Sequence, residues 1–248
     1  HRTKVKEQVH APDWTTEARR DYTIRCFRIL AQLLPEGMEG GISTSPLTYR
    51  HWFSTDVEKE EAFAQAKAHL IEVVEELVRL RRETGKLLHL DLEPEPDGLI
   101  ENSEELIHYF KDWLLTKGKA KLAKKLGIVE KEAAALILDH LQVCYDVCHF
   151  AIGYEKPKET FQKLKKAGIR IGKIQLSAAL KLLIPDSPFE RFSIGKRLEE
   201  FADTTYLHQV VGRTQEKGLI SYPDLPQAIA LLNNTKDLEW RVHFHVPI

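Results

Sequence analysis

The segment LLHLDLE, Leu87–Glu93, alternates strictly between apolar and polar side chains. Successive side chains of a β-strand point to opposite faces, so its leucines would share one face and its histidine, aspartate and glutamate the other. The strands of a doubly wound open sheet are apolar on both faces. A barrel can instead direct one face of each strand into a lumen, whose mouth at the C-terminal ends of the strands carries the chemistry. The segment therefore favours a barrel.

Three further segments resemble strands that end in polar side chains: Gln142–His149 (QVCYDVCH), Lys173–Ser177 (KIQLS) and Trp240–Val246 (WRVHFHV). Helical segments separate most of the predicted strands, and such alternation is typical of a parallel sheet covered by helices. We expect the polar ends of these strands to converge. The predicted fold is an α/β chain with a (β/α) TIM barrel, in a single domain over residues 1–248.

Local signals place several of the other elements. Thr55 and Glu58 have the spacing of a capping box before a long amphipathic helix, which Gly85 would end in the left-handed conformation. A helical region from about residue 103 to 141 should break near its two internal glycines, Gly118 and Gly127. Residues 206–211 and 219–222 are predicted to form a hairpin.

Composition limits the classes of partner. The chain has 248 residues, of which 43% are hydrophobic, and its 36 Lys and Arg nearly balance its 37 Asp and Glu. No overall field favours nucleic acid or an anionic membrane, so we expect a small-molecule metabolite as partner and leave oligomer formation open. Because no stretch of about 18 uncharged apolar residues occurs, no membrane span is expected. The three cysteines should be reduced, and the protein cytoplasmic.

Glu93, Asp146 and His149 are candidate metal ligands, and the Asp146–His149 spacing is the sharpest local signal. Glu93 would sit at the rim of the sheet before a rigid Pro-Glu-Pro turn, although a solvated turn glutamate is an alternative. Asp146 ends a predicted strand, and His149 follows three residues later, so both can turn toward one cation. The alternative there is an Asp–His hydrogen bond that fixes the loop.

Two other segments add polar side chains to the predicted lumen. Gln175 and Lys173 share the inward face of their strand, where they would hydrogen-bond a substrate or each be satisfied within the lining. His243 and His245 lie two residues apart, so both would face the lumen as metal ligands, about 6.5–7 Å from each other.

Further roles follow from the same pattern. Arg241 shares the face of the two histidines and, like His208, is a candidate to bind substrate. His149 or His245 could move a proton. Mixed oxygen and nitrogen ligands suit zinc, manganese or cobalt.

These strand-end motifs resemble those of the xylose-isomerase-like TIM-barrel superfamily, which includes sugar isomerases, epimerases and the endonuclease IV type of abasic-site nuclease. Within it, the chain looks like the metabolite-traffic protein family of the bacterial ebo cluster. The segments that carry this likeness are PEGMEGGISTS (35–45), LHLDLEPEP (88–96), YDVCHF (145–150), KIQLSAA (173–179), YLHQVV (206–211) and WRVHFHVP (240–247).

The resemblance implies one to three divalent metals held at strand ends. Carried over, the ligand positions are Glu93, Asp146 with His149, and Gln175, while His243 and His245 resemble an Asp-x-His motif of the nuclease branch. A glutamate that ends the family's eighth strand has no counterpart. The resemblance therefore implies a barrel that lacks the family's first strands and its last strand.

Three functions remain open from the sequence. The first is a metal-dependent isomerase or epimerase acting on a small polyhydroxylated metabolite. The second, which the ebo-family likeness implies, is a non-catalytic protein that binds such a metabolite for traffic. The third, an abasic-site nuclease, requires a basic rim, and the near-neutral net charge makes nucleic acid an unlikely partner.

Overall fold

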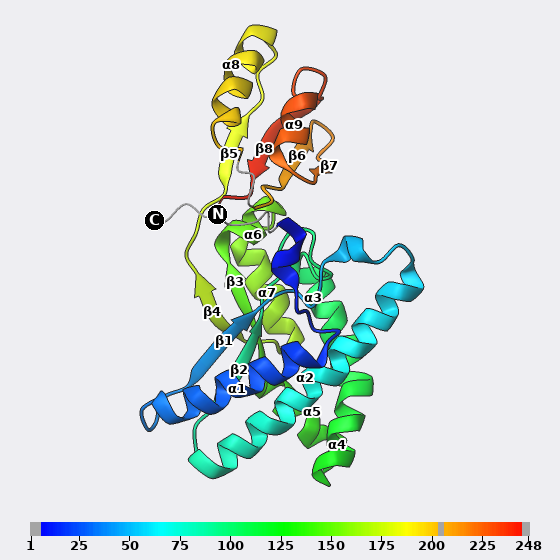
Figure 1. The fold of residues 1–248 in the computed structure, drawn as a ribbon, viewed down its shortest axis with the longest axis vertical. Coiled ribbons are helices and arrows are strands. Elements are labelled where there is room, and N and C mark those ends of the chain that lie inside the picture. The colour runs from blue at the N-terminus through cyan, green and yellow to red at the C-terminus, as the bar shows by residue number, and fades with distance from the viewer. Residues whose placement is uncertain (1–5, 203–205, 245–248) are drawn as a thin grey trace. The chain divides into compact units, whose positions relative to one another are not determined.

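The structure, a computed structural model, describes residues 6–202 and 206–244 (Figure 1). Its internal packing divides the chain into two compact units. The parallel-sheet unit comprises His10–Tyr145 and Pro157–Gln175, and the antiparallel-sheet unit comprises the residues up to Val9, Asp146–Lys156 and the residues from Leu176 onward. The prediction of a single domain over residues 1–248 is not tested by this division and stays a prediction.

A four-stranded sheet organises the parallel-sheet unit, with the strand order β1-β2-β3-β4. The strands are β1 (Gly40–Thr44), β2 (Leu88–Leu92), β3 (Leu141–Asp146) and β4 (Ile171–Gln175). Strand β2 pairs in parallel with β1 and with β3, and the sheet curls into a half-barrel. The α/β class is as predicted, and the half-barrel is compatible with part of a TIM barrel.

Helices alternate with the strands of this sheet along the chain. They are α1 (Glu17–Leu33), α2 (Asp56–Thr84), α3 (Ser103–Tyr109), η3 (Phe110–Gly118), α4 (Lys119–Leu126), α5 (Glu130–His140) and α7 (Pro157–Ala167), with a short 3-10 turn at Arg50–Trp52. A second 3-10 turn, Lys6–His10, includes the point at which the chain passes from one unit to the other. Both α2 and α5 pack against β2. All five side chains of β2 are buried, the polar ones included.

The boundaries of α2 confirm the local predictions. The Thr55 hydroxyl accepts a hydrogen bond from the Glu58 backbone N–H, and the Glu58 carboxylate accepts one from the Thr55 backbone N–H. At the other end of the helix, Gly85 is left-handed with φ 71°. The break predicted near Gly118 is wrong, because the π-helical turn η3 runs directly into α4. A Cβ at position 118 would lie 3.1 Å from Ile71 Cδ1 of α2, so this glycine serves close helix packing. Gly127 does end α4, with φ 66°.

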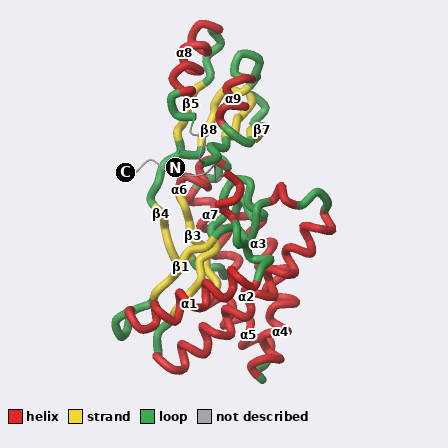
Figure 2. Tube along the Cα trace, in the orientation of Figure 1, coloured by secondary structure: helices red, strands yellow, loops and turns green. Residues whose placement is uncertain are grey.

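A second four-stranded sheet, with the order β5-β8-β6-β7, organises the antiparallel-sheet unit (Figure 2). Its elements are α6 (Val147–Ile152), β5 (Leu180–Leu183), α8 (Pro188–Glu199), β6 (Val210–Thr214), β7 (Leu219–Tyr222), α9 (Leu225–Leu231) and β8 (Asp237–Val242). Trp240, fully buried, lies in a core with Val210, Leu225 and Val242. None of the helices in the part of the chain that the structure describes combines the length and apolar character needed to cross a bilayer.

The last strand corrects the prediction that four strands converge in parallel. Strand β8 pairs antiparallel with both β5 and β6, in a sheet separate from β1–β4. The prediction failed because side-chain alternation gives the faces of a strand but neither the identity nor the direction of its partners. Strand β5 was not predicted, whereas the β6–β7 hairpin was, although β6 begins at Val210 rather than at residue 206.

Candidate metal centre

Asp146 occupies the junction between β3 and α6. It is fully buried, and its Oδ1 accepts hydrogen bonds from the backbone N–H of Cys148 (2.8 Å) and of His149 (3.3 Å), which makes it the N-cap of α6. The Ser177 hydroxyl donates to the same oxygen at 2.7 Å. Three donors on one oxygen hold the carboxylate in a single orientation, as a metal ligand requires.

Glu93 directly follows β2, the strand that pairs with β3. Its backbone N–H donates to the Thr44 carbonyl (3.0 Å), so the sheet pairing continues past the end of β2. Gln175, the last residue of β4, donates from Nε2 to Glu93 Oε1 at 3.2 Å. Gln175 therefore lies beside this carboxylate, at the position expected of a lumen residue.

Glu93, Asp146 and His149 form a group that can hold a metal ion. Each offers one ligand atom, and these atoms all lie within 4.8 Å of one another. Two carboxylates and one imidazole form the mixed oxygen and nitrogen set that suits zinc, manganese or cobalt. Three of the six candidate ligands of the sequence analysis are therefore placed together.

His149 is oriented by a chain of hydrogen bonds. Its Nε2 lies 3.1 Å from His243 Nε2, and His243 Nδ1 lies 2.7 Å from Gln209 Oε1. Because an amide oxygen can only accept, His243 donates from Nδ1; in its neutral form it then accepts at Nε2 from the Nε2–H of His149. The lone pair of His149 then lies on Nδ1, which makes Nδ1 the nitrogen able to bind a metal.

The predicted proximity of His243 to His149 is observed. His243, however, follows β8 of the antiparallel sheet and does not belong to a strand parallel to β3. His245, predicted as a metal ligand and as a proton donor, lies outside the described residues. Ser177 and Gln209 were not predicted. Ser177 continues the face of Lys173 and Gln175 two residues on, which is a usable signal, whereas nothing local marks Gln209.

The remaining candidates have structural partners. Lys173 Nζ donates to Ser43 Oγ (3.0 Å), and His208 Nδ1 lies 3.0 Å from the His243 carbonyl oxygen. Arg241 forms an ion pair with Glu239 (2.9 Å), and its guanidinium lies 4.0 Å from the centre of the Tyr154 ring. Their predicted substrate-binding roles stay predictions.

A second buried polar pair lies on β2. His89 Nδ1 is 2.7 Å from Asp91 Oδ1, and both residues are buried. Burial raises the pKa of the Asp91 carboxyl, while the hydrogen bond from His89 opposes the shift. Gly41 and Gly172 provide the space, because a Cβ at position 172 would lie 2.0 Å from Asp91 Oδ1 and one at position 41 would lie 2.2 Å from His89 Cε1.

The cysteines are free thiols, as predicted, and Cys144 and Cys148 are buried. Cys148 Sγ donates to the Phe244 carbonyl oxygen at 3.4 Å. Burial, and then the neighbouring Asp146 carboxylate, raise the pKa of the Cys148 thiol to about 12. A thiol with this pKa stays protonated near neutral pH, so Cys148 acts as a small packing residue.

Comparison of the chain with protein-family models, with curated proteins and with solved structures found no match. The geometry of the site is therefore the basis for a functional conclusion.

Proposed function

We propose that the protein binds a divalent metal ion through Glu93, Asp146 and His149, and handles a small polyhydroxylated metabolite beside it. The observation that carries this proposal is the three-ligand group, whose atoms lie within 4.8 Å of one another. The reaction class we propose is that of the sugar isomerases and epimerases, which the strand-end motifs resemble.

The three ligand side chains suit a divalent metal ion chemically. Asp146 is oriented by Ser177 and by two backbone amides, and His149 has its lone pair on Nδ1 because its Nε2–H is donated to His243. When bound, the metal would polarise a carbonyl or hydroxyl group of the metabolite. Gln175, already bonded to Glu93, keeps that carboxylate turned toward the end of the sheet.

Other roles follow for the residues of this chain. Because His149 donates its one ring N–H to His243, we assign it to metal binding rather than to proton transfer. The Lys173 ammonium group, which donates to Ser43, is a cation on the polar face of β4 and can orient a hydroxyl or phosphate group of the metabolite.

Metal binding is tested by titrating the metal-free protein with zinc, manganese and cobalt in a calorimeter. We expect one ion bound per chain, and loss of that stoichiometric binding in Glu93→Gln and in Asp146→Asn. Glu95→Gln is the matched control, since it changes a glutamate of the same turn that lies outside the ligand group. Equal affinity in the wild type and in all three variants would exclude this site.

The orientation of His149 is tested by Gln209→Ala. Without the Gln209 amide, neither the His243 ring nor the His149 ring is held in one tautomer. Metal affinity should therefore fall by about 10–100-fold. An unchanged affinity would contradict the hydrogen-bond chain.

The reaction is tested separately, by following aldose–ketose and epimer interconversion by NMR with the metal-loaded protein. Turnover that disappears with a chelator and in Glu93→Gln supports the isomerase proposal. A sugar that binds and is recovered unchanged would favour a non-catalytic, metabolite-carrying role instead.

A further inference from the structure

Helix α6, which carries the candidate metal ligand His149, is short. It comprises six residues, Val147–Ile152, and Asp146 caps its N-terminal end. Isolated helices shorter than about 12 residues are marginal in water, so contacts with the rest of the fold must hold a helix of this length in place. The position of His149 therefore also depends on what binds the C-terminal end of α6.

Arg241 of β8 binds that end. Its Nη1 donates to the carbonyl oxygen of Ala151 at 2.5 Å, and α6 packs against β8. The last carbonyls of a helix lack partners within the helix, and a cation beside them also interacts favourably with the helix dipole. Arg241 thus supplies both a donor and a positive charge where α6 ends.

The guanidinium of Arg241 is itself held by a buried carboxylate. Its Nε donates to Glu239 Oε1 at 2.9 Å, and Glu239 is 4% exposed. The other carboxylate oxygen, Oε2, binds Arg213 of β6 (3.0 Å) and Lys181 of β5 (3.3 Å). Because cations from three adjacent strands surround this carboxylate, it stays ionised and fixes the orientation of Arg241. The rigid fork of a guanidinium can then serve the carboxylate and the helix at the same time.

Tyr154, which follows α6, adds a second connection at the same place. Its ring centre lies 4.0 Å from the Arg241 guanidinium, and its hydroxyl donates to the carbonyls of Val211 (3.3 Å) and Glu239 (3.1 Å). Its backbone N–H donates to the Ala151 carbonyl at 3.0 Å. The chain that leaves α6 is therefore bound to β6 and β8.

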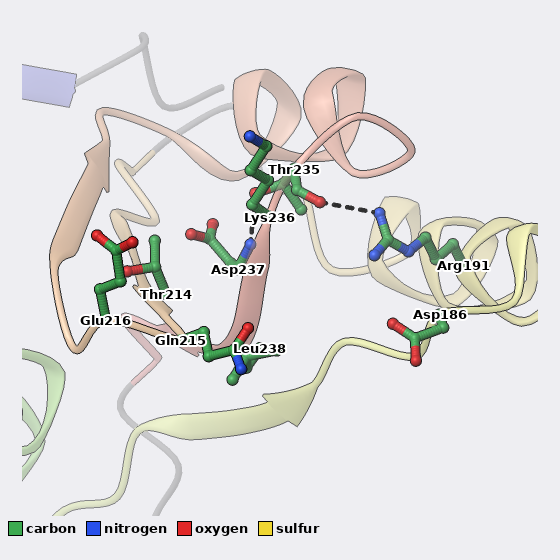
Figure 3. A pocket seen from close by; sticks show the side chains of 9 residues that line it. All are labelled: Asp186, Arg191, Thr214, Gln215, Glu216, Thr235, Lys236, Asp237 and Leu238. Atoms are coloured by element: carbon green, nitrogen blue, oxygen red, sulfur yellow. Dashed lines mark hydrogen bonds between the residues drawn. The ribbon is translucent and has the colours of Figure 1, made fainter.

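Strand β8 is a firm support for these contacts. It lies between β5 and β6 in the antiparallel sheet, and its Trp240 is fully buried. Just before and at its start, the Thr235 hydroxyl accepts a hydrogen bond from the Asp237 backbone N–H, and the Thr235 carbonyl accepts one from Arg191 Nη1, both at 3.1 Å (Figure 3). An interior strand that is fixed at its start can hold α6 in one position.

The same segment of chain reaches α6 at a second point. His243 follows β8, two residues after Arg241, and its Nε2 lies 3.1 Å from His149 Nε2. The segment thus holds α6 both at His149 and at Ala151. A helix attached at two points cannot rotate about its axis or slide along the strand without breaking one of these bonds.

We propose that Arg241 is a positioning residue of the metal centre, which holds α6 so that Nδ1 of His149 can bind the metal. This inference rests on the proposed metal site and adds to it a residue that is not one of the ligands. A metal ligand must be held within about 0.5 Å of its productive position, and loss of a supporting contact typically costs about 10–100-fold in metal affinity.

The first part of the test uses the metal-free full chain without substrate, so that a role in substrate binding cannot affect the result. Arg241→Ala removes the side-chain donor to Ala151. Hydrogen exchange at the amides of Gly153 and Glu155, which close the last turn of α6, should accelerate by at least about tenfold. The ring ¹⁵N shifts of His149 at mildly alkaline pH should move toward a mixture of the two tautomers, because its bond to His243 is no longer enforced.

The second part measures zinc affinity by calorimetry, which should fall by about tenfold in Arg241→Ala. Arg241→Lys keeps a cation for Glu239, but its single nitrogen cannot serve Glu239 and Ala151 together. This variant should therefore unfold in urea at the same midpoint as the wild type and still lose zinc affinity. A merely structural role would leave the zinc affinity of the lysine variant unchanged.

Arg213→Ala is the matched control. Arg213 binds the same carboxylate and lies 4.8 Å from the centre of the same Tyr154 ring, but within the described part of the chain it makes no bond to α6. Exchange, ring shifts and zinc affinity should match the wild type.

Unchanged exchange or unchanged zinc affinity in Arg241→Ala, or equal losses in Arg213→Ala, would overturn the proposal. If the wild type itself binds no zinc, manganese or cobalt, the proposed metal function fails. The exchange rates and the His149 ring shifts then decide by themselves whether Arg241 positions α6.

Discussion

Two glycines, one on β1 and one on β4, decide whether the His89–Asp91 pair can exist. Gly172 and Gly41 lie where any side chain would overlap the carboxylate or the imidazole. The alternation of side chains in β2 predicted that these two polar groups share a face, but it did not predict that the facing positions of β1 and β4 must be glycine. Such a requirement is set by a residue of another strand, which the local pattern does not contain.

Gly172→Ala should destabilise the protein by about 3 kcal/mol, because the new Cβ would lie 2.0 Å from Asp91 Oδ1 in a buried region that cannot expand easily. Urea unfolding followed by far-UV circular dichroism measures the change. Gly153→Ala is the control, since its Cβ would have no neighbour closer than 3.7 Å. Equal transition midpoints for the two variants would show that the sheet relaxes around position 172.

Helix ends were the most predictable elements. The capping box of Thr55 and Glu58 and the left-handed Gly85 were read correctly because each is completed by residues within four positions in the sequence. Strand partners were less predictable. The antiparallel pairing of β8 with β5 and β6 joins segments that lie far apart in the chain, and the same alternating pattern fits either direction.

Thr55→Ala should cost about 1 kcal/mol, since the backbone N–H of Glu58 loses its acceptor. Hydrogen exchange at the Glu58 amide should accelerate, while the middle of α2 keeps its protection. Thr55→Ser retains the hydroxyl and should restore slow exchange. Fast exchange in the serine variant would show that the hydroxyl is not the stabilising group.

The two units have separate cores, and this bears on how the molecule unfolds. The antiparallel-sheet unit is centred on Trp240, whereas the leucines of β2 lie in the core of the parallel-sheet unit. Because core residues stabilise mainly the unit that buries them, a cavity-creating substitution in one core should lower the unfolding free energy of that unit first.

Trp240→Ala should remove about 3–5 kcal/mol from the antiparallel-sheet unit, because it leaves a large cavity and deprives Asp237 of a hydrogen-bond donor. Hydrogen exchange should accelerate in β6 and β8 while β2 keeps its protection. Trp52→Ala, a change at a residue that is 37% exposed, is the control and should leave both patterns nearly unchanged. Simultaneous loss of protection in β2 would show that the two units unfold as one.

The alternation of LLHLDLE and the helical segments around it were enough to establish an α/β chain with one polar strand face, because side-chain direction in a strand follows from backbone geometry alone. The same rule identified Glu93, Asp146, Gln175, His243 and His245 as ligand candidates at strand ends, and the Asp-x-x-His spacing added His149. Packing between distant segments decided the rest: the second sheet and the bonds of Ser177 and Gln209 that orient the ligands. Those features depend on which segments meet in space, and that is set by the summed burial of many side chains rather than by any local pattern.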